Sequence, residues 1–375
     1  MKNILITGGA GFIGKTLTKF LYSKGYNVTI LDNFSPQIHG KNPKQTIREL
    51  QEISKLIIGD VRDAEKCYQS IKNQDIIIHL AAETGTGQSM YKINHYNDVN
   101  IMGTSTLLES ILNTSHNIQK LIIASSRAIY GEGKYYSEKL GFQYPLSRSE
   151  INLKNKDFEV KCPISNLNME GIATDELSKI HPNSIYGMNK YQQEQMMLLI
   201  GKSLDISTIS LRFQNVYGPG QSLFNPYTGI LSVFSTNILN SNNIEIYEDG
   251  NQTRDFIYID DVIESIFLSI KSSDIQQGVF NVGSGKSIKV IDVARKLRDL
   301  YNSSIEINIS GRYRVGDIRH NFADVKKSKE YLGFESKTDF DSGIKDFVKW
   351  VECQDVMIDR YKESVIELKK KGMIK

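Results

Sequence analysis

The stretch NILITGGAGFIG, residues 3–14, decides the fold of this chain. It begins with a short apolar run typical of a buried strand, and glycines follow at positions 8, 11 and 14. Such spacing allows a tight turn, a backbone without side chains beside a pyrophosphate, and close packing of the next helix on the sheet. The N–H groups at the start of that helix can bind phosphates. The stretch predicts a dinucleotide-binding turn formed by Gly8, Gly11, Phe12, Ile13 and Gly14.

Further apolar runs alternate with helix-like sequence along the first part of the chain. They are NVTILD (27–32), KLIIGD (55–60), DIIIHLAA (75–82), KLIIASS (120–126) and ISTISLRF (206–213). Near-continuous Ile, Leu and Val are typical of strands buried on both faces of a parallel sheet. The alternation predicts an α/β fold with a doubly wound, Rossmann-type parallel sheet. We expect a cofactor-binding domain over residues 1–212 and a smaller C-terminal α/β substrate-binding lobe over residues 213–375, some segments of which return to the first domain.

Carboxylates end two of these runs and bear on the choice of cofactor. Asp32 ends the second run, 18 residues after Gly14. A carboxylate there can accept both hydroxyls of a ribose and would repel a 2′-phosphate. No arginine follows it closely, so the sequence favours NAD over NADP. Asp60 ends the third run, where we expect it to meet the adenine.

A tyrosine and a lysine in SIYGMNKYQQEQ, residues 184–195, are candidates for acid–base chemistry. Tyr186 and Lys190 are four residues apart, and on a helix they share one face. A nearby ammonium stabilises phenolate and lowers the pKa of a tyrosine from about 10, so Tyr186 can take a proton from a sugar hydroxyl. Of the four Tyr-x-x-x-Lys pairs in the chain, only this one combines a helical pattern with a place after the fifth strand. The others are Tyr68/Lys72, Tyr130/Lys134 and Tyr135/Lys139.

The composition argues against several classes of protein. The 46 basic and 43 acidic residues leave a net charge of only +3, which does not favour a nucleic-acid-binding protein. The cysteines Cys67, Cys162 and Cys353 are far apart without metal-binding spacing, so we expect reduced thiols and no metal site. No apolar run approaches the roughly 18 residues of a membrane helix. The N-terminus enters a strand at once and leaves no room for a signal peptide. We therefore expect a cytoplasmic protein without a membrane partner.

Residues 131–181 interrupt the alternation of strands and helices. A segment of this length with little periodicity is too long for an ordinary connection. Long loops of this kind often carry function. We expect this excursion to cover the substrate.

Several motifs together resemble the extended short-chain dehydrogenase/reductase family, in the group that acts on nucleotide-linked sugars. In the first part of the chain they are TGGAGFIG (7–14), GDVRD (59–63), HLAAETG (79–85), VNIMGT (99–104), SSRAIYG (125–131), YGMNK (186–190) and LRFQNVYGPG (211–220). The motifs GNQTRDFIYIDDV (250–262), FNVGSG (280–285) and RVGD (314–317) extend the resemblance into the second lobe. The resemblance covers nearly the whole chain, and the combination of motifs is highly specific.

The resemblance implies roles for particular residues. Ser126 would hydrogen-bond the reacting sugar oxygen, Tyr186 would be the acid and base, and Lys190 would lower its pKa and hold the nicotinamide ribose. Asn215, Arg254 and Arg314 would grip the substrate diphosphate, and planar guanidinium forks do match phosphate oxygens. Asp317 would lie on the nucleoside side, and Thr84 and Arg127 are further substrate positions. The remaining cofactor positions would be Asn33, Val61, Leu80, Ala81, Ala82, Asn100 and Phe213.

The stretch SSRAIYG bears on the type of reaction. In the related sugar-nucleotide 4,6-dehydratases, the two positions after the hydroxyl residue carry Asp and Glu, which expel water from the sugar. Here these positions hold Arg127 and Ala128. An arginine stays protonated and cannot act as a base, and alanine has no reactive group. Dehydration is therefore disfavoured, which leaves epimerisation, reduction or decarboxylation. Arg127 either contacts substrate or cofactor, or anchors the excursion.

Within the family, four stretches look closest to the dTDP-L-rhamnose 4-epimerase subgroup, with the CDP-sugar 2-epimerases as a near alternative. They are HLAAETGTGQSMY (79–91), SSRAIYGEG (125–133), FEVKCP (158–163) and SLFNPYTGIL (222–231). The resemblance implies an epimerase of a nucleotide-diphosphate sugar, acting at C4 through a transient 4-keto sugar with tightly bound, recycled NAD.

Three other functions stay open at this point. They are a CDP- or UDP-sugar epimerase, an NAD(P)H-dependent reductase of a keto-sugar nucleotide, and a non-catalytic NAD-sensing scaffold. The presence of Ser126, Tyr186 and Lys190 disfavours the scaffold. The family's usual homodimer, a four-helix bundle, would use the helical pattern at 91–113 and the Tyr186 helix.

Overall fold

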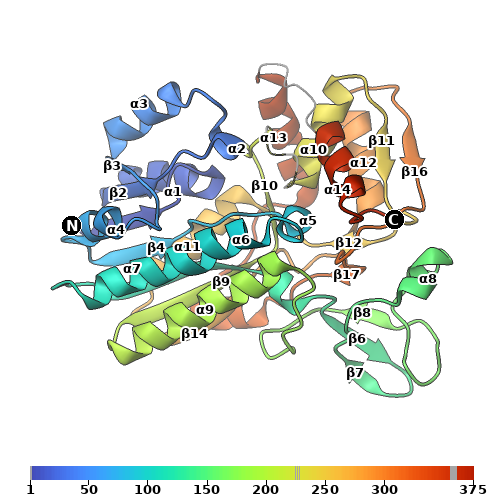
Figure 1. Ribbon diagram of the computed structural model, residues 1–375, viewed down its shortest axis with the longest axis horizontal. Helices are drawn as coiled ribbons and strands as arrows, with labels where there is room; N and C mark the ends of the chain where they lie inside the picture. The colour runs from blue at the N-terminus through green and yellow to red at the C-terminus, as the bar shows by residue number, and fades with distance from the viewer. Residues whose placement is uncertain (1, 224, 226, 228, 355–360) are drawn as a thin grey trace.

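The computed structural model describes residues 2–223, 225, 227, 229–354 and 361–375. A parallel sheet of seven strands lies at its centre, in the order β14-β9-β5-β4-β1-β2-β3 (Figure 1). The strands are β1 (Asn3–Thr7), β2 (Asn27–Asp32), β3 (Lys55–Ile58), β4 (Ile76–His79), β5 (Lys120–Ser126), β9 (Ser207–Phe213) and β14 (Gln277–Val282). Every strand predicted from an apolar run is present, and the predicted fold class is confirmed.

Helices cover both faces of this sheet. One face is covered by α1 (Phe12–Ser23), α3 (Lys44–Ile53) and α11 (Ile259–Lys271), and the other by α4 (Ala64–Ile71), α7 (Gly103–Leu112) and α9 (Ile185–Ser203). Ile4 and Ile6 are buried on the first face, and Leu5 is buried on the second. Because successive strand residues point to opposite faces, two covered faces require the continuous apolar runs seen in the sequence.

The edge strand β14 was not among the predicted strands. It pairs in parallel with β9, from Gln277 opposite Thr208 to Val282 opposite Phe213. Only its second half is buried, because an edge strand has a neighbour on one side alone, and its sequence QGVFNV therefore lacks a long apolar run. The C-terminal part of the chain thus contributes one strand to the central sheet.

In the residues that the structure describes, the second lobe consists of short strands and four longer helices. Its strands are β10 (Asn215–Tyr217), β11 (Ile244–Ile246), β12 (Thr253–Arg254), β13 (Phe256–Tyr258), β15 (Ile288–Lys289), β16 (Ile307–Ile309) and β17 (His320–Asn321). Its helices are α10 (Ile230–Leu239), α12 (Val290–Leu300), α13 (Phe340–Glu352) and α14 (Tyr361–Lys370). Phe234, Ile246 and Val293 of this lobe belong to the same buried cluster as Ile4 of the central sheet. One continuous core therefore holds the lobe against the sheet.

The excursion has its own regular structure. β6 (Lys134–Ser137) pairs antiparallel with β7 (Gly141–Gln143) and β8 (Glu170–Ile172), and the short helix α8 (Glu150–Lys154) follows β7 in the chain. A small core of its own contains Tyr135, Val160, Cys162 and Met169. Figure 1 shows this unit projecting from the rest of the molecule, below the second lobe.

Candidate active site

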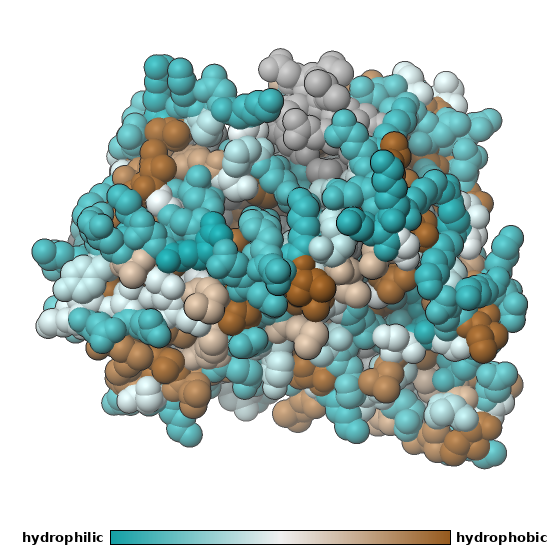
Figure 2. All heavy atoms as spheres, viewed as in Figure 1, coloured by the Kyte–Doolittle hydropathy of each residue, from teal (hydrophilic) through white to brown (hydrophobic). Residues whose placement is uncertain are grey.

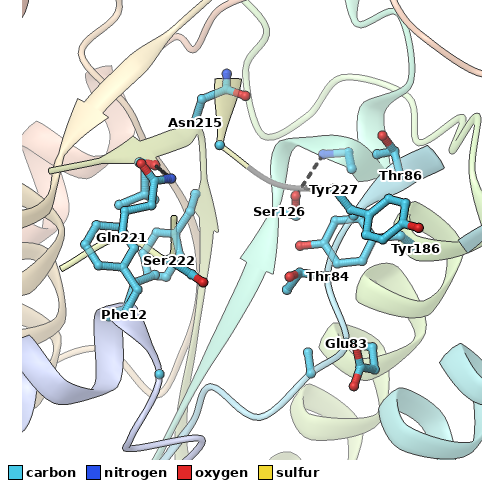
Figure 3. Close-up of a pocket in the computed structure, with 18 of the residues that line it drawn as sticks. Phe12, Glu83, Thr84, Thr86, Ser126, Tyr186, Asn215, Gln221, Ser222 and Tyr227 are labelled. Atoms are coloured by element: carbon cyan, nitrogen blue, oxygen red, sulfur yellow. Dashed lines mark hydrogen bonds between the residues drawn. The ribbon is translucent and has the colours of Figure 1, made fainter. Parts of the chain in front are cut away.

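A cavity of about 520 Å³ lies beyond the carboxyl ends of the central strands β1, β4, β5 and β9. Ligands of open parallel sheets bind at this edge, where the strand order reverses, which here is between β1 and β4. Figure 3 looks into the cavity. The predicted site residues that line it are Gly8, Gly11, Phe12, Ile13, Gly14, Asp32, Asn33, Val61, Leu80, Ala81, Ala82, Thr84, Ser126, Arg127, Tyr186, Lys190, Phe213, Asn215, Arg254, Arg314 and Asp317.

The glycine turn between β1 and α1 fits the pyrophosphate of a dinucleotide. Gly8 has φ of +71°, and a Cβ on it would lie 2.7 Å from the backbone nitrogen of Ala81. A Cβ on Gly14 would lie 2.4 Å from the carbonyl oxygen of Gly8. Gly11 caps α1 without any side chain, so the N–H groups of the helix start are open to an anion. Gly8 and Gly14 therefore leave no room for a larger side chain, and α1 packs directly on the turn.

Asp32 lies at the end of β2 with its carboxylate in the cavity wall. One carboxylate oxygen accepts a hydrogen bond from the Ala10 N–H at 2.9 Å, and the other accepts one from the Phe34 N–H at 2.8 Å. These backbone donors fix the carboxylate and leave lone pairs for ribose hydroxyls. The arrangement fits the predicted role in NAD binding.

Two predicted cofactor residues are absent from the cavity wall, among the residues that the structure describes. Asp60 forms an ion pair with Arg62 at 2.9 Å and accepts a hydrogen bond from Asn33 at 2.8 Å. The hydrogen bonds from Arg62 lower the pKa of Asp60 to about 2. Asn100 accepts a hydrogen bond from the backbone N–H of Glu83 at 2.7 Å and donates one to its carbonyl at 3.1 Å. Asp60 therefore fixes the side chain of the lining residue Asn33, and Asn100 fixes the backbone of the lining residue Glu83.

The predicted catalytic residues come together at one point of the cavity. Ser184 caps α9 by accepting a hydrogen bond from the Gly187 N–H at 3.0 Å, which places Tyr186 in the first turn of the helix and Lys190 one turn later. Ser126 ends β5, and Figure 3 shows its hydroxyl beside the ring of Tyr186. Burial raises the pKa of Tyr186, whereas the Ser126 hydroxyl and the Arg127 guanidinium act to lower it. Tyr186 thus has the neighbours needed to stabilise both its phenol and its phenolate.

A buried chain of polar groups lies behind Lys190. Its ammonium donates to Gln193 at 2.9 Å, and Gln193 donates to Thr104 at 2.7 Å. His79 contacts Thr104 at 2.9 Å and Thr7 at 2.7 Å. Burial lowers the pKa of Lys190 to about 7 and the pKa of His79 to about 3. His79 is therefore a neutral, packed side chain that fixes the lysine through its neighbours.

The other Tyr-x-x-x-Lys pairs lie outside the cavity wall. Tyr68 is 50% exposed on α4. Tyr130 and Tyr135 are buried in other contacts: the Tyr130 hydroxyl accepts from Arg212 at 2.7 Å, and the Tyr135 hydroxyl lies near Glu132. Only Tyr186 among these four tyrosines lines the cavity.

Arg127 also lies in the cavity wall, next to Ser126. Burial lowers the pKa of Arg127 to about 10, and the nearby Arg254 acts in the same direction. Within the described part of the chain no ion pair joins Arg127 to the excursion. The structure therefore favours the first of the two predicted roles, contact with a ligand.

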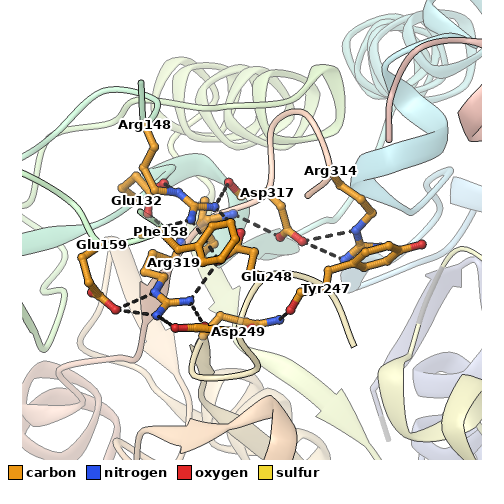
Figure 4. Close-up of polar contacts among 12 residues, drawn as sticks. Glu132, Arg148, Phe158, Glu159, Tyr247, Glu248, Asp249, Arg314, Asp317 and Arg319 are labelled. Carbon is orange, nitrogen blue, oxygen red and sulfur yellow. Dashed lines mark hydrogen bonds and ion pairs between the residues drawn. The ribbon is translucent and has the colours of Figure 1, made fainter. Parts of the chain in front are cut away.

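The far end of the cavity carries a group of charges that we call the diphosphate cluster, Arg254, Arg314 and Asp317. Asp317 forms ion pairs with Arg254 at 2.9 Å and with Arg314 at 2.8 Å. Burial would raise the pKa of Asp317, but these guanidiniums outweigh it and hold the pKa well below its usual range. Arg314 lies over the ring of Tyr247, 5.3 Å from its centroid (Figure 4). Two cations and an aromatic face suit a nucleoside diphosphate.

A buried ionic network connects the excursion to this cluster (Figure 4). Arg148 of the excursion donates to Glu132 at 3.1 Å, to Glu248 at 2.7 Å and to the carbonyl oxygen of Asp317 at 3.1 Å. Arg319, which is fully buried, contacts Glu248 at 3.0 Å and donates its backbone N–H to Glu132 at 2.8 Å. The network thus holds the segment that carries Asp317.

The lining of the cavity gives no support to the prediction that the excursion covers the substrate. Among the described residues, those lining the cavity include none between Ala128 and Tyr186. The excursion has a small apolar core of its own. It is joined to the rest of the chain by the network of Figure 4 and by backbone hydrogen bonds such as that from the Thr174 N–H to the Phe322 carbonyl oxygen at 2.9 Å.

No helix in the described part of the chain is long and apolar enough to span a membrane. The same residues contain no group of three or more side chains that could hold a metal ion.

One protein-family model matches most of the chain. The model of the NAD dependent epimerase/dehydratase family matches residues 4–148 and 167–283. The chain belongs to this family. The NAD dependence of the family agrees with the cofactor predicted from Asp32 and the glycine turn. Residues 149–166, which the family model does not match, fall within the excursion.

Individual relatives of this family are similar over nearly their whole length. A dTDP-L-rhamnose 4-epimerase from Burkholderia thailandensis is 35% identical over 93% of this chain and 95% of its own. The crystal structure of a UDP-glucose 4-epimerase from Thermotoga maritima with UDP-glucose is 27% identical, with a TM-score of 0.75 over 93% of this chain and 98% of that one. The structure of MoeE5 with UDP-glucuronic acid and NAD is 26% identical, with a TM-score of 0.74 over 93% and 99%. The predicted family resemblance is confirmed.

Several lining residues were not predicted. Glu83, Thr86, Gln221, Ser222, Tyr227 and Tyr247 all face the cavity. Glu83 and Thr86 flank the predicted Thr84, and Tyr227 lies in the stretch SLFNPYTGIL, so proximity to a motif could have pointed to them. Tyr247 follows a strand of the second lobe and carries no such signal.

Proposed function

We propose that the protein is an epimerase of a nucleotide-diphosphate sugar that acts at C4 and uses NAD, with dTDP-L-rhamnose as the first candidate substrate. The proposal rests on one observation: the catalytic residues, the glycine turn and the diphosphate cluster line a single cavity. Ser126 and Tyr186 lie in the same cavity as the diphosphate cluster and the glycine turn. A nucleotide sugar anchored at the cluster therefore has its sugar directed toward the tyrosine.

The reaction assigns separate tasks to the residues of the site. Tyr186 takes the proton of the C4 hydroxyl, and Ser126 donates a hydrogen bond to the same oxygen. NAD, held by the glycine turn and Asp32, would supply the hydride acceptor and donor for that carbon. Lys190 and Arg127 provide positive charge that stabilises the Tyr186 phenolate. Tyr186 in its phenol form then gives the proton back, so the overall reaction is an isomerisation.

Two features separate this reaction from its rivals in the family. The positions after Ser126 are occupied by Arg127 and Ala128, which supply no carboxylate for the loss of water from the sugar. The diphosphate cluster holds the substrate by its nucleotide end, so the 4-keto sugar is free to turn over while it stays bound. The similarity to the Burkholderia thailandensis enzyme supports dTDP-L-rhamnose as the first donor to test.

The test is incubation of the purified protein, without added cofactor, with dTDP-, UDP-, CDP- and GDP-sugars, followed by NMR. We expect a new stereoisomer of unchanged mass from one donor, with the inverted centre at C4. Oxidation of added NADH by a keto-sugar nucleotide, with no isomer from any donor, would instead make the protein a reductase.

The proposal includes a homodimer and a cytoplasmic location. Met102, Leu112, Met188 and Leu199 are each between 48% and 68% exposed, and they lie along or beside α7 and α9. Figure 2 shows hydrophobic patches over these two adjacent helices. Pairing of this face with its copy would bury them in a four-helix bundle. Light scattering of the protein and of a Met188→Lys/Leu199→Lys variant tests the dimer, and a monomeric wild-type protein would contradict it.

A further inference from the structure

Three residues of the cavity wall contact the same C-terminal segment. This segment, residues 361–375, comprises α14 and the residues that follow it, and we call it the C-terminal strap. The three residues are Tyr227, Tyr247 and Arg314, which come from separate parts of the second lobe. None of the strap residues themselves lines the cavity, within the described part of the chain. The strap therefore lies behind the wall and can act on it.

At the sugar end of the cavity, the strap contacts Tyr227 through a carboxylate. The Tyr227 hydroxyl donates to Glu367 of α14 at 2.6 Å and accepts from the Tyr91 hydroxyl at 3.1 Å. The hydrogen bond from Tyr227 lowers the pKa of Glu367. Hydrogen bonds to an ionised acceptor are stronger than those between neutral groups. Glu367 thus fixes the orientation of Tyr227.

Tyr227 lines the same cavity as the reacting groups. Figure 3 shows its side chain in the cavity together with those of Tyr186 and Thr84. A Cβ built on the lining residue Gly85 would lie 3.1 Å from the Cβ of Tyr227. The ring therefore packs directly on the loop after β4 and forms part of the wall around the sugar.

At the other end of the cavity, the strap pairs with the backbone on both sides of Arg314. Tyr313 and Lys375 exchange backbone hydrogen bonds of 2.9 and 3.0 Å, and the Val315 N–H donates to the Met373 carbonyl at 2.9 Å. These bonds pair the segment around Arg314 with the end of the strap as in an antiparallel β-ladder. The side chain of Arg314 then lies over Tyr247.

The apolar contacts of the strap converge on the same wall. Leu368 and Ile374 form a small buried cluster with Tyr247, and Tyr91 packs against it. This cluster is separate from the continuous core of the sheet and second lobe. The strap therefore packs mainly against the substrate wall, and its loss would leave the central core intact.

We propose that the C-terminal strap is a positioning element of the substrate site: Glu367 orients Tyr227 at the sugar end, and residues 373–375 hold the strand of Arg314 at the diphosphate end. The inference rests on the proposed function, since it assigns the strap to nucleotide-sugar binding. The strap sets the affinity for the nucleotide sugar and leaves the affinity for NAD unchanged, because the wall residues that it contacts are Tyr227, Tyr247 and Arg314 and not those of the glycine turn or Asp32.

The test compares Glu367→Gln, Tyr227→Phe and their double variant in the full-length, NAD-loaded protein. The matched control is Glu363→Gln, an exposed glutamate on the same helix. The measurements are the Kd for dTDP-L-rhamnose by calorimetry, KM and kcat, bound NAD, and the melting temperature. We expect Tyr227→Phe, which removes the hydrogen bonds of its hydroxyl to Glu367 and from Tyr91, to raise Kd and KM by about threefold to tenfold. Glu367→Gln leaves only a neutral acceptor for the Tyr227 hydroxyl and should raise them by a smaller factor. The double variant should be no weaker than Tyr227→Phe, since Glu367 acts on the site through the Tyr227 hydroxyl, which that variant already lacks.

Three outcomes would overturn the strap proposal. They are a Glu367→Gln protein that binds like the Glu363→Gln control, losses that add in the double variant, and a loss of bound NAD or of melting temperature in parallel with affinity. A wild-type protein that binds the nucleotide sugar without epimerising it would instead contradict the proposed function, and the same titrations would still measure the strap. A second pair, Leu368→Ala against the exposed Ile366→Ala, should reproduce the effect at the diphosphate end.

Discussion

The two ends of the cavity are built in different ways. The cofactor end is formed by short, continuous pieces of sequence: a turn after β1 and a carboxylate at the end of β2. The diphosphate cluster takes Arg254 from β12 and Arg314 and Asp317 from a later loop, and it is supported by the excursion and the C-terminal strap. Backbone geometry therefore determines the first end, and long-range ionic contacts determine the second.

This difference indicates which part of the site can change its ligand by substitution. A pyrophosphate bound by backbone N–H groups tolerates few changes in the turn, because each glycine is in contact with other backbone atoms. A cluster held by side chains from distant segments can be altered by one substitution in its support. We expect the cofactor to be the fixed property of this molecule and the nucleotide sugar to be the adjustable one.

The largest expected effect is at the point where the two ends meet. Tyr186→Phe removes the group that transfers the proton, so turnover should fall by about 100-fold to 10,000-fold while bound NAD stays at the wild-type level. The measurement is the rate of isomer formation together with the NAD content after denaturation. The control is Tyr68→Phe, whose ring is 50% exposed, and it should turn over normally. Full activity of Tyr186→Phe would contradict the mechanism.

The second prediction concerns the support of the diphosphate cluster. Arg148→Ala leaves the buried Glu132 and Glu248 without their shared cation, and removal of one partner from such a group costs about 3–5 kcal/mol of stability. We expect a lower free energy of unfolding in urea, a raised KM and unchanged NAD content in the folded protein. Arg298→Ala, which breaks a surface pair with Asp299, should change stability by less than about 1 kcal/mol. If Arg148→Ala and Arg298→Ala changed stability and KM equally, the diphosphate cluster would not depend on the ionic network in the way described.

The third prediction tests the cofactor end. A Cβ at position 14 would lie 2.4 Å from the Gly8 carbonyl oxygen, so Gly14→Ala must displace the turn. Overpacking of this kind costs about 1–3 kcal/mol, and we expect NAD affinity to fall by about tenfold to 100-fold. Gly11→Ala, whose Cβ would lie 3.3 Å from the same oxygen, should displace the turn less, so its loss of NAD affinity reports the methyl group beside the pyrophosphate. NAD titration of the stripped protein measures both, and wild-type affinity in Gly14→Ala would show that the turn does not bind the cofactor.

The smallest expected effect is a change in pH dependence. The Arg127 guanidinium acts to lower the pKa of Tyr186. Its removal in Arg127→Gln should raise the pKa of Tyr186, so the phenolate forms only at higher pH. The acid limb of the kcat/KM profile should therefore move to higher pH, and Arg127→Lys should restore it in part. A profile unchanged in both variants would assign Arg127 to substrate binding alone.

The sequence predicted the parts of the molecule that depend on local pattern. The glycine turn, Asp32 and the buried strands follow from contiguous residues whose periodicity and spacing have one physical explanation. The choice of Tyr186 among four similar pairs was correct in placing it on a helix beside the cavity, because Ser184 caps that helix. Asp60 and Asn100 were expected to contact the cofactor, and the structure gives both a supporting position, since spacing cannot show which way a side chain points.

The parts that were missed depend on contacts between distant residues. The excursion was expected to cover the substrate, but none of its described residues lines the cavity. Its short antiparallel strands have no periodicity from which they could be predicted. Tyr227 and Tyr247 line the cavity while they contact the C-terminal strap, which is more than 100 residues away in the sequence. Ion pairs such as Arg148–Glu248 join residues 100 positions apart, and a single sequence carries no signal for them.

The position of β14 has a consequence for how the chain is made. Its partner β9 is complete at residue 213, but β14 ends at residue 282, so the ribosome adds about 70 residues before that edge of the sheet is paired. During this interval the backbone groups of β9 form an open edge, which other chains can join. We expect the nascent protein to require chaperone protection between these two points and to fold in a single late step.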